Sequence, residues 1–242
     1  MAFHDTTLSA EIVDRAQAMT ARLGRIEFYD RLLAGTLDRD GYAAWLVQMH
    51  KYVRYSETVA RGLADAMAGR DPADPIAASL REYAEWEYME EAAHDDLILK
   101  DLSVLWGTSV REAFGRVEST AKAPSIAAWE AGLDLLLQSY PEAVAGVALA
   151  LETVAAGICD RIHANMLATG SVSEAPDALR FVHAHRAEVE DEHRSHAACQ
   201  VDLVEDPAVR GAIFAFACGA LTLFEGLGFF LDEVQREPLL AA

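Results

Sequence analysis

The sequence predicts an all-α protein, a bundle of about seven to nine helices. Apolar residues recur at helical intervals along almost the whole chain, and alternating strand-like runs are absent. The seven prolines lie mostly between the periodic stretches. With 242 residues, 52% of them hydrophobic, the chain can bury a sizeable core, and we expect a single domain over residues 1–242.

Helix-capping residues, prolines and glycines predict where each helix begins and ends. Asp38 or Asp40 is placed to cap a long helix, Pro124 and Pro141 lie in first turns, and the linker 69–75 breaks the chain. The helices are expected from Ser9 to about Gly24, about Arg25 to Leu33, Asp38 or Asp40 to about Met67, the linker to Leu105, Val110 to Val117, Pro124 to about Ser139, Pro141 to Leu167, 175–200 and 207–236.

The segment 212–231 is about as long as a membrane span. It contains Glu225, which would cost about 2.5–3.5 kcal/mol near a bilayer centre. Asp232 and Glu233 follow it instead of a basic flank. We therefore expect a core helix and no membrane partner; this apolar helix could also supply the face of a homodimer.

The net charge of −19 indicates that nucleic acid, a polyanion, is not a partner. The three cysteines, Cys159, Cys199 and Cys218, include no CxxC pair, which argues against a disulfide framework or a cysteine zinc site. The N-terminal residues lack the basic and apolar regions of a secretory signal. These features together favour a cytoplasmic protein.

Four of the expected helices carry carboxylates or imidazoles on faces that should be buried. Residues three apart share a helical face, so each Glu-x-x-His pair can bind one ion. Glu152 is the only charged residue among fifteen in 144–158, and an unpaired carboxylate there is costly to bury. The candidate ligands are Glu57, Glu91, His94, Glu152, Glu190 and His193.

This set matches the ligands of di-iron and di-manganese carboxylate bundles, which use two single glutamates and two Glu-x-x-His pairs. Oxygen and imidazole ligands without thiolate suit iron or manganese. Each motif alone has an ordinary alternative: the helices around Glu91 and Glu190 are strongly acidic and could face water, and Glu152 could pair with a structural arginine. The inference depends on the four helices together.

The order Glu, Glu-x-x-His, Glu, Glu-x-x-His over this many helices resembles the haem-oxygenase-like di-iron oxidases and oxygenases. The stretch 32-LLAGTLDRDGYAAWLVQMHKYVRYSE-57 is similar to that fold's short helix, turn and long helix. The 34-residue spacing from Glu57 to Glu91 and the leucine-rich run after His94 are also similar. The resemblance covers about residues 25–235 and implies a haem-oxygenase-like bundle in which the six candidates bind metal.

The sequence departs from the family in the last of these helices. Many members have a histidine four residues before the last carboxylate, where this chain has Arg186, and an aspartate in place of Glu190. His183 or His196 could complete the ligand set of the second metal instead.

The resemblance implies an enzyme, a non-haem oxygenase that uses two Fe²⁺ ions, O₂ and an external reductant to oxidise a small molecule in a biosynthetic pathway. We favour N-oxygenation of a small amine or amino acid, with C–C cleavage or desaturation of an amino or fatty acid as the alternative. Arg54, Arg61 and Arg186 are candidates to bind a substrate carboxylate, although they could equally pair with neighbouring acids. A non-catalytic metal-binding or helical interaction protein is a further alternative.

Overall fold

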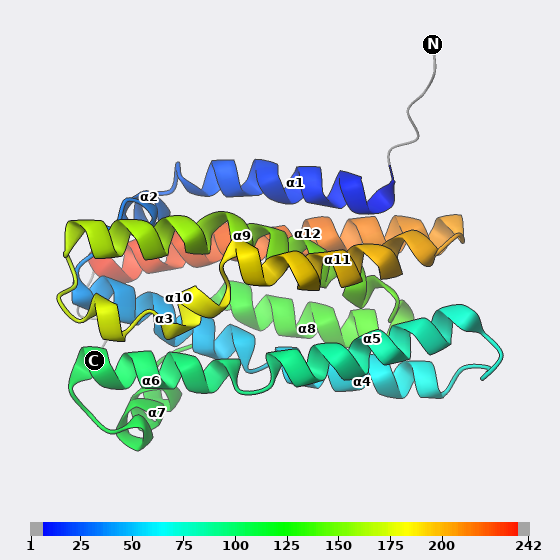
Figure 1. Ribbon diagram of the computed structural model, residues 1–242, viewed down its shortest axis with the longest axis horizontal. Helices are drawn as coiled ribbons and strands as arrows, with labels where there is room; N and C mark the ends of the chain where they lie inside the picture. Colours follow the sequence, from blue (N-terminus) through cyan, green and yellow to red (C-terminus); the bar gives the residue numbers. More distant parts are fainter. Residues whose placement is uncertain (1–6, 237–242) are drawn as a thin grey trace, which may run out of the picture.

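The structure is a computed structural model that describes residues 7–236. Over this range the chain forms twelve α-helices and one 3₁₀ turn, most of them along one long axis, and no strand (Figure 1). The predicted all-α class is confirmed. The helices are α1 (Leu8–Leu23), α2 (Glu27–Leu33), α3 (Arg39–Val53), α4 (Ser56–Ala68), α5 (Pro75–Glu91), α6 (His94–Trp106), α7 (Val110–Ser119), α8 (Pro124–Ser139), α9 (Ala143–Thr169), α10 (Arg180–Ala184), α11 (Ala187–Leu203) and α12 (Pro207–Arg236), with the 3₁₀ turn at Ala175–Asp177.

Helix α9 is the centre of the bundle. It packs against α1, α11 and α12 on one side of the molecule (Figure 1). The pairs α3–α6 and α4–α5 form the other side, and α11 and α8 contact both sides. Gly146 lets α9 approach α12 closely, because a Cβ atom there would lie 2.4 Å from Ile213. This packing places the middle of α9, where Glu152 lies, between α5 and α11.

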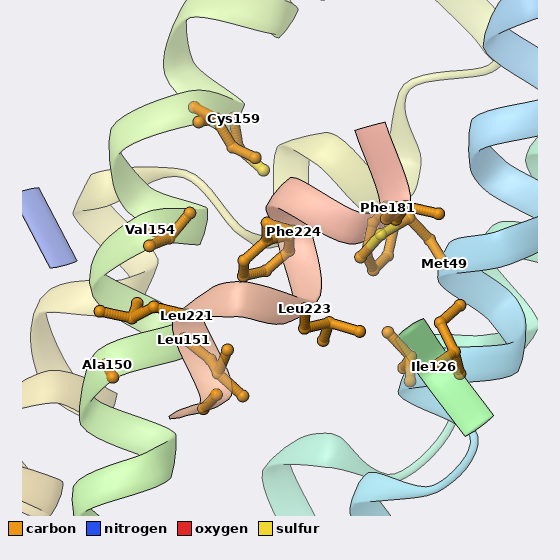
Figure 2. Close-up of a cluster of buried hydrophobic side chains, with 14 of the residues drawn as sticks. Met49, Ile126, Ala150, Leu151, Val154, Cys159, Phe181, Leu221, Leu223 and Phe224 are labelled. Carbon is orange, nitrogen blue, oxygen red and sulfur yellow. The ribbon is translucent and has the colours of Figure 1, made fainter. Parts of the chain in front are cut away.

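The buried apolar side chains form one continuous cluster between these helices. In Figure 2, Phe224 of α12 lies between Leu151, Val154 and Cys159 of α9 and Met49 of α3. A fully buried side chain of this size contributes about 1.5–3 kcal/mol through removal from water. The cluster therefore fixes the relative positions of the helices that carry the polar residues described below.

Three predicted helices are broken, so the chain has more helical segments than expected. The helix from Asp38 to Met67 turns at Arg54 and Tyr55, where the Tyr55 N–H bonds three residues back to Tyr52 instead of four. The helix ending at Leu105 breaks at Ala92 and Ala93, and the segment 175–200 breaks before α11. None of these breaks contains glycine or proline, and tertiary packing outweighs helix propensity at each.

Helices α9 and α12 are long and apolar enough to cross a membrane by length and composition alone. The bundle buries 72% of the apolar window of α9, as expected for a core helix. It buries only 44% of the corresponding window of α12, where Phe229 is exposed. Helix α12 therefore packs into the core along one face and leaves an uncharged face uncovered.

Candidate metal centre

Seven carboxylate and imidazole side chains converge inside the bundle, between α5, α6, α9 and α11. They are Glu87 and Glu91 from α5, His94 from the start of α6, Glu152 from α9, His185 from the end of α10, and Glu190 and His193 from α11. Glu190 and His193 are buried, at 2% and 5% exposure. Four carboxylates gathered in the interior of a protein require a compensating positive charge.

Two groups of three potential ligands lie within this cluster. Ligand atoms of Glu91, His94 and His185 lie within 4.8 Å of one another, and so do those of Glu87, Glu152 and His193. Each group combines carboxylate oxygen with imidazole nitrogen. The arrangement thus offers two neighbouring positions of the kind that a dinuclear carboxylate site provides.

The break between α5 and α6 brings three of these side chains together. Glu87 and Glu91 are four residues apart and share one face of α5. Ala93 then adopts a left-handed conformation (φ 72°, ψ 11°), and His94 begins the next helix. As a result, Nδ1 of His94 lies 3.4 Å from Oε1 of Glu91. A non-glycine residue in this conformation costs about 1–3 kcal/mol, and such strain concentrates at functional sites.

His185 is held in position by the short helix α10. Buried Asp101 of α6 accepts hydrogen bonds from the backbone N–H groups of Arg180 (3.2 Å) and Phe181 (3.0 Å), at the start of that helix. At its end, Nδ1 of His185 lies 2.8 Å from the carbonyl oxygen of Phe181. When Nδ1 donates this bond, Nε2 is free to bind a metal, which is the usual support of a histidine ligand.

Burial and mutual repulsion shift the titration of three carboxyl groups. Burial, reinforced by the charge of Glu91, raises the pKa of Glu87 to about 8. Burial and the same neighbour raise the pKa of Glu190 to about 8. Burial and the charges of Glu87 and Glu190 raise the pKa of Glu152 well above its usual range. Without a cation the cluster therefore retains protons near neutral pH.

Glu91 is the exception among the four carboxylates. Burial alone would raise its pKa, but the imidazoles of His94 and His185 outweigh burial and lower that pKa to about 2. In return, Glu91 raises the pKa of His94 against the opposing effect of burial. Burial lowers the pKa of His185 to about 4, so this imidazole is neutral and available as a ligand at neutral pH.

Five buried ligand atoms in the cluster have no hydrogen-bond partner among the described residues. They are Oε2 of Glu87, Glu152 and Glu190, and Nδ1 of His94 and His193. Buried polar atoms are usually satisfied, so unsatisfied ones indicate a missing partner. All five can donate an electron pair to a cation. The residues present therefore fit a metal centre, and an oxygen and nitrogen donor set suits iron or manganese.

An apolar cavity of about 110 Å³ ends at this cluster. Glu87, Glu91, Glu152, His185 and Glu190 line one part of it. Its other walls are apolar or aromatic, including Met49, Tyr52, Trp129, Leu151 and Phe224, and no lysine or arginine lines it. The ionisable carboxylates and imidazole of the cluster thus line a pocket whose remaining walls are mainly apolar, as in many small-molecule sites.

Three solved structures with similar architecture identify the fold. A protein of unknown function from Shewanella denitrificans, described as having a haem oxygenase-like fold, aligns with 94% of this chain and 91% of its own at 18% identity, with a TM-score of 0.74. A TenA homologue from Pseudomonas syringae aligns with 95% and 93% at 12% identity and a TM-score of 0.69. Haem oxygenase-1 from Synechocystis, solved with haem, aligns with 97% and 94% at 14% identity and a TM-score of 0.56.

The chain has the haem-oxygenase-like fold. No protein-family model and no curated protein sequence matches it. Because identities below 20% establish the fold alone, the chemistry of this haem-oxygenase-like chain has to be argued from its own side chains.

Five of the six ligands predicted from the sequence lie in the cluster, namely Glu91, His94, Glu152, Glu190 and His193. Glu57 does not join them. It lies with Arg54, Arg61 and Asp95 at a separate surface depression, while Ser56 and Ala60 of the same helix face the cavity. The turn at Arg54 and Tyr55 rotates the start of α4, so Glu57 points away from the interior of the haem-oxygenase-like bundle.

Glu87 and His185 are in the cluster but were not predicted. Glu87 lies four residues before Glu91 and seven before His94, a helical spacing that could have identified it. His185 carries no such signal, because it is five residues before Glu190 and would lie on a different face of a continuous helix. Only the break between α10 and α11 turns it inward.

The other predicted site residues lie outside the cluster. His183 is exposed beside His163, and His196 is exposed against Trp86, with ring centroids 5.5 Å and 4.3 Å apart. Each arginine proposed for substrate has a partner: Arg54 bonds Glu118, Arg61 bonds Tyr88, and Arg186 bonds Asp160. These three arginines do not line the cavity.

Proposed function

We propose that this chain is a non-haem di-iron oxygenase that uses O₂ to oxidise a small molecule with an apolar body. One observation carries the proposal: four buried or partly buried carboxylates and three imidazoles, five of them with an unsatisfied ligand atom, lie together beside an apolar cavity. A structural ion site would not need an adjoining cavity, and an interaction domain would not need the buried carboxylates.

Each part of the cluster has a defined task in this proposal. Glu87, Glu152 and His193 would hold one ion, and Glu91, His94 and His185 the other, with Glu190 beside both groups. When bound, two Fe²⁺ ions supply the redox chemistry that activates O₂. The apolar walls would exclude water and hold the substrate's apolar body, so that its reactive group faces the carboxylates. An external reductant provides electrons.

The first candidate reaction is N-oxygenation of an amine with an apolar body. The carboxylates of the cluster are the charged groups that such an amine would meet in the cavity. The second candidate is C–C cleavage or desaturation of an acyl or amino acid chain, favoured by the apolar walls. In either case the partners are a small molecule and an electron donor, and the free cysteines are compatible with a reducing cytoplasm.

The test is an anaerobic titration of metal-free protein with Fe²⁺, followed by oxygen-uptake measurements with a reductant. We expect about two equivalents of iron to bind, and oxygen consumption that rises when a suitable apolar amine or fatty acid is added. Product analysis then separates the reactions, because N-oxygenation retains the carbon skeleton whereas cleavage shortens it. Saturable iron binding without oxygen consumption would indicate a metal-binding protein, and no saturable binding would rule out the di-iron proposal.

A further inference from the structure

A surface groove runs between α8 and α12, with a volume of about 280 Å³. None of the residues that line it is charged, in a chain whose net charge is −19. The lining residues are Ser125, Ala128, Trp129, Gly132, Leu133, Leu136, Ala215, Phe216, Gly219, Ala220, Thr222 and Leu223. This groove includes much of the uncovered apolar face of α12.

One layer of side chains separates the groove from the apolar cavity at the metal centre. Trp129 and Leu133 line both spaces. On α12, Leu223 lines the groove and the next residue, Phe224, lines the cavity; both are labelled in Figure 2. Tyr52, which also lines the cavity, packs against both Trp129 and Phe224, with ring centroids 6.3 Å and 6.2 Å apart.

Glycines keep the groove open. A Cβ atom at Gly132 of α8 or at Gly219 of α12 would meet no other atom within 4 Å. Neither glycine has a positive φ, so neither position requires glycine for its backbone conformation. Glycine in a helix interior costs about 1 kcal/mol relative to alanine. At Gly132 and Gly219 the absence of a side chain therefore leaves space in the groove, at a cost in helix stability.

We propose that the groove and the cavity are the outer and inner halves of one substrate channel, and that Trp129 and Leu133 form its gate. The channel takes a ligand with an uncharged apolar chain, since both halves lack charged side chains except at the candidate metal centre. The inference rests on the proposed function only for the oxidation of the ligand at the candidate metal centre. The open groove, the shared wall and the cavity do not depend on it.

The experiment measures the binding of linear 1-alkanols, from hexanol to dodecanol, to the full-length metal-free protein by calorimetry. Each buried methylene contributes about a fourfold gain in affinity. Short alcohols fit the inner cavity alone, whereas long ones extend past Trp129 into the groove. We expect the affinity of the wild type to keep rising along the series.

Variants Gly132→Trp and Gly219→Trp fill the groove. We expect them to bind hexanol within twofold of the wild type and dodecanol at least tenfold more weakly. Gly115→Trp on α7 is the matched control, because its Cβ would also meet no atom within 4 Å and it lies outside the groove. Stopped-flow measurements on Trp129→Ala should show faster association of all the alcohols than the wild type shows, and an unchanged association rate would contradict the gate.

Equal dodecanol affinity in the wild type and both groove variants would overturn the proposal, and so would a wild type that binds no alkanol. Light scattering on the same samples tests a second copy of the chain as occupant of the groove. If Gly219→Trp converted a dimer into a monomer and left dodecanol affinity unchanged, the groove would be an interface instead. Iron titration of the same variants tests the proposed function separately from the channel. Iron binding can be absent, which would contradict the di-iron proposal, while alkanol binding still follows the pattern predicted for the channel.

Discussion

Glu152 is the carboxylate most strongly controlled by its surroundings. It is the only charged residue in the segment 144–158 of α9, its Oε2 atom has no partner among the described residues, and three glutamates lie close enough to raise its pKa. In water such a group would be ionised, but here burial and the neighbouring charges favour the protonated form. A cation bound as we propose would reverse that preference, so Glu152 is the residue at which we expect metal binding to affect stability most directly.

The first prediction concerns Glu152→Gln. We expect this variant to lower Fe²⁺ or Mn²⁺ affinity at least tenfold, because a ligand of the cluster is lost, while the metal-free protein is at least as stable as the wild type. Metal titration and urea unfolding measure the two effects. Glu57→Gln is the matched control, and we expect it to keep the wild-type stoichiometry because Glu57 lies outside the cluster. Loss of metal binding in Glu57→Gln would contradict the assignment.

At the scale of the element, helix breaks assemble the site. The break at Ala93 lets α5 contribute Glu87 and Glu91 while α6 starts with His94. The break before α11 turns His185 toward His94, with ring centroids 4.8 Å apart. A continuous helix through α10 and α11 would place His185 and Glu190 on different faces, so it could not bring both side chains into the cluster.

The second prediction tests the support of α10. Asp101→Asn removes the buried carboxylate that accepts hydrogen bonds from the backbone of Arg180 and Phe181. We expect a loss of about 1–3 kcal/mol in the free energy of unfolding, since a buried partner is lost. Metal affinity should also fall, because α10 holds His185 in position. Asp96→Asn, an exposed position on the same helix, should leave both quantities unchanged.

At the scale of the whole molecule, the cluster makes stability depend on pH. The pKa values of Glu87 and Glu190 are raised to about 8 in the folded protein, against 4.5 for an ordinary glutamate. Between pH 6.5 and 8 the folded metal-free protein therefore holds protons that the unfolded chain has released. Because the folded state then binds more protons than the unfolded state, the free energy of unfolding decreases as pH rises. Histidines whose pKa is lowered are neutral in the folded protein but still partly protonated in the unfolded chain near pH 6.5, so they weaken this trend at the lower limit of the window and have no effect on it by pH 8.

The third prediction follows from this sign. The melting temperature of the metal-free protein should fall from pH 6.5 to pH 8, and a saturating Mn²⁺ concentration should reverse the fall, because the deprotonated carboxylates then bind the ion. Thermal unfolding monitored by circular dichroism, with and without Mn²⁺, measures both. A melting temperature that rises over this range without metal would mean that these carboxylates are ionised in the folded protein.

The sequence alone determined the helical class and most helix ends, because periodicity, capping residues and prolines are local signals. It also predicted Glu91, His94, Glu152, Glu190 and His193, which the fold brings into one cluster, because carboxylates in apolar or paired contexts stand out along a helix. Tertiary structure decided the rest. The turn at Arg54 and Tyr55 directs Glu57 outward, and the break before α11 brings in His185. These breaks lack glycine and proline and form because contacts between distant helices outweigh local helix propensity, a balance that no short stretch of sequence encodes.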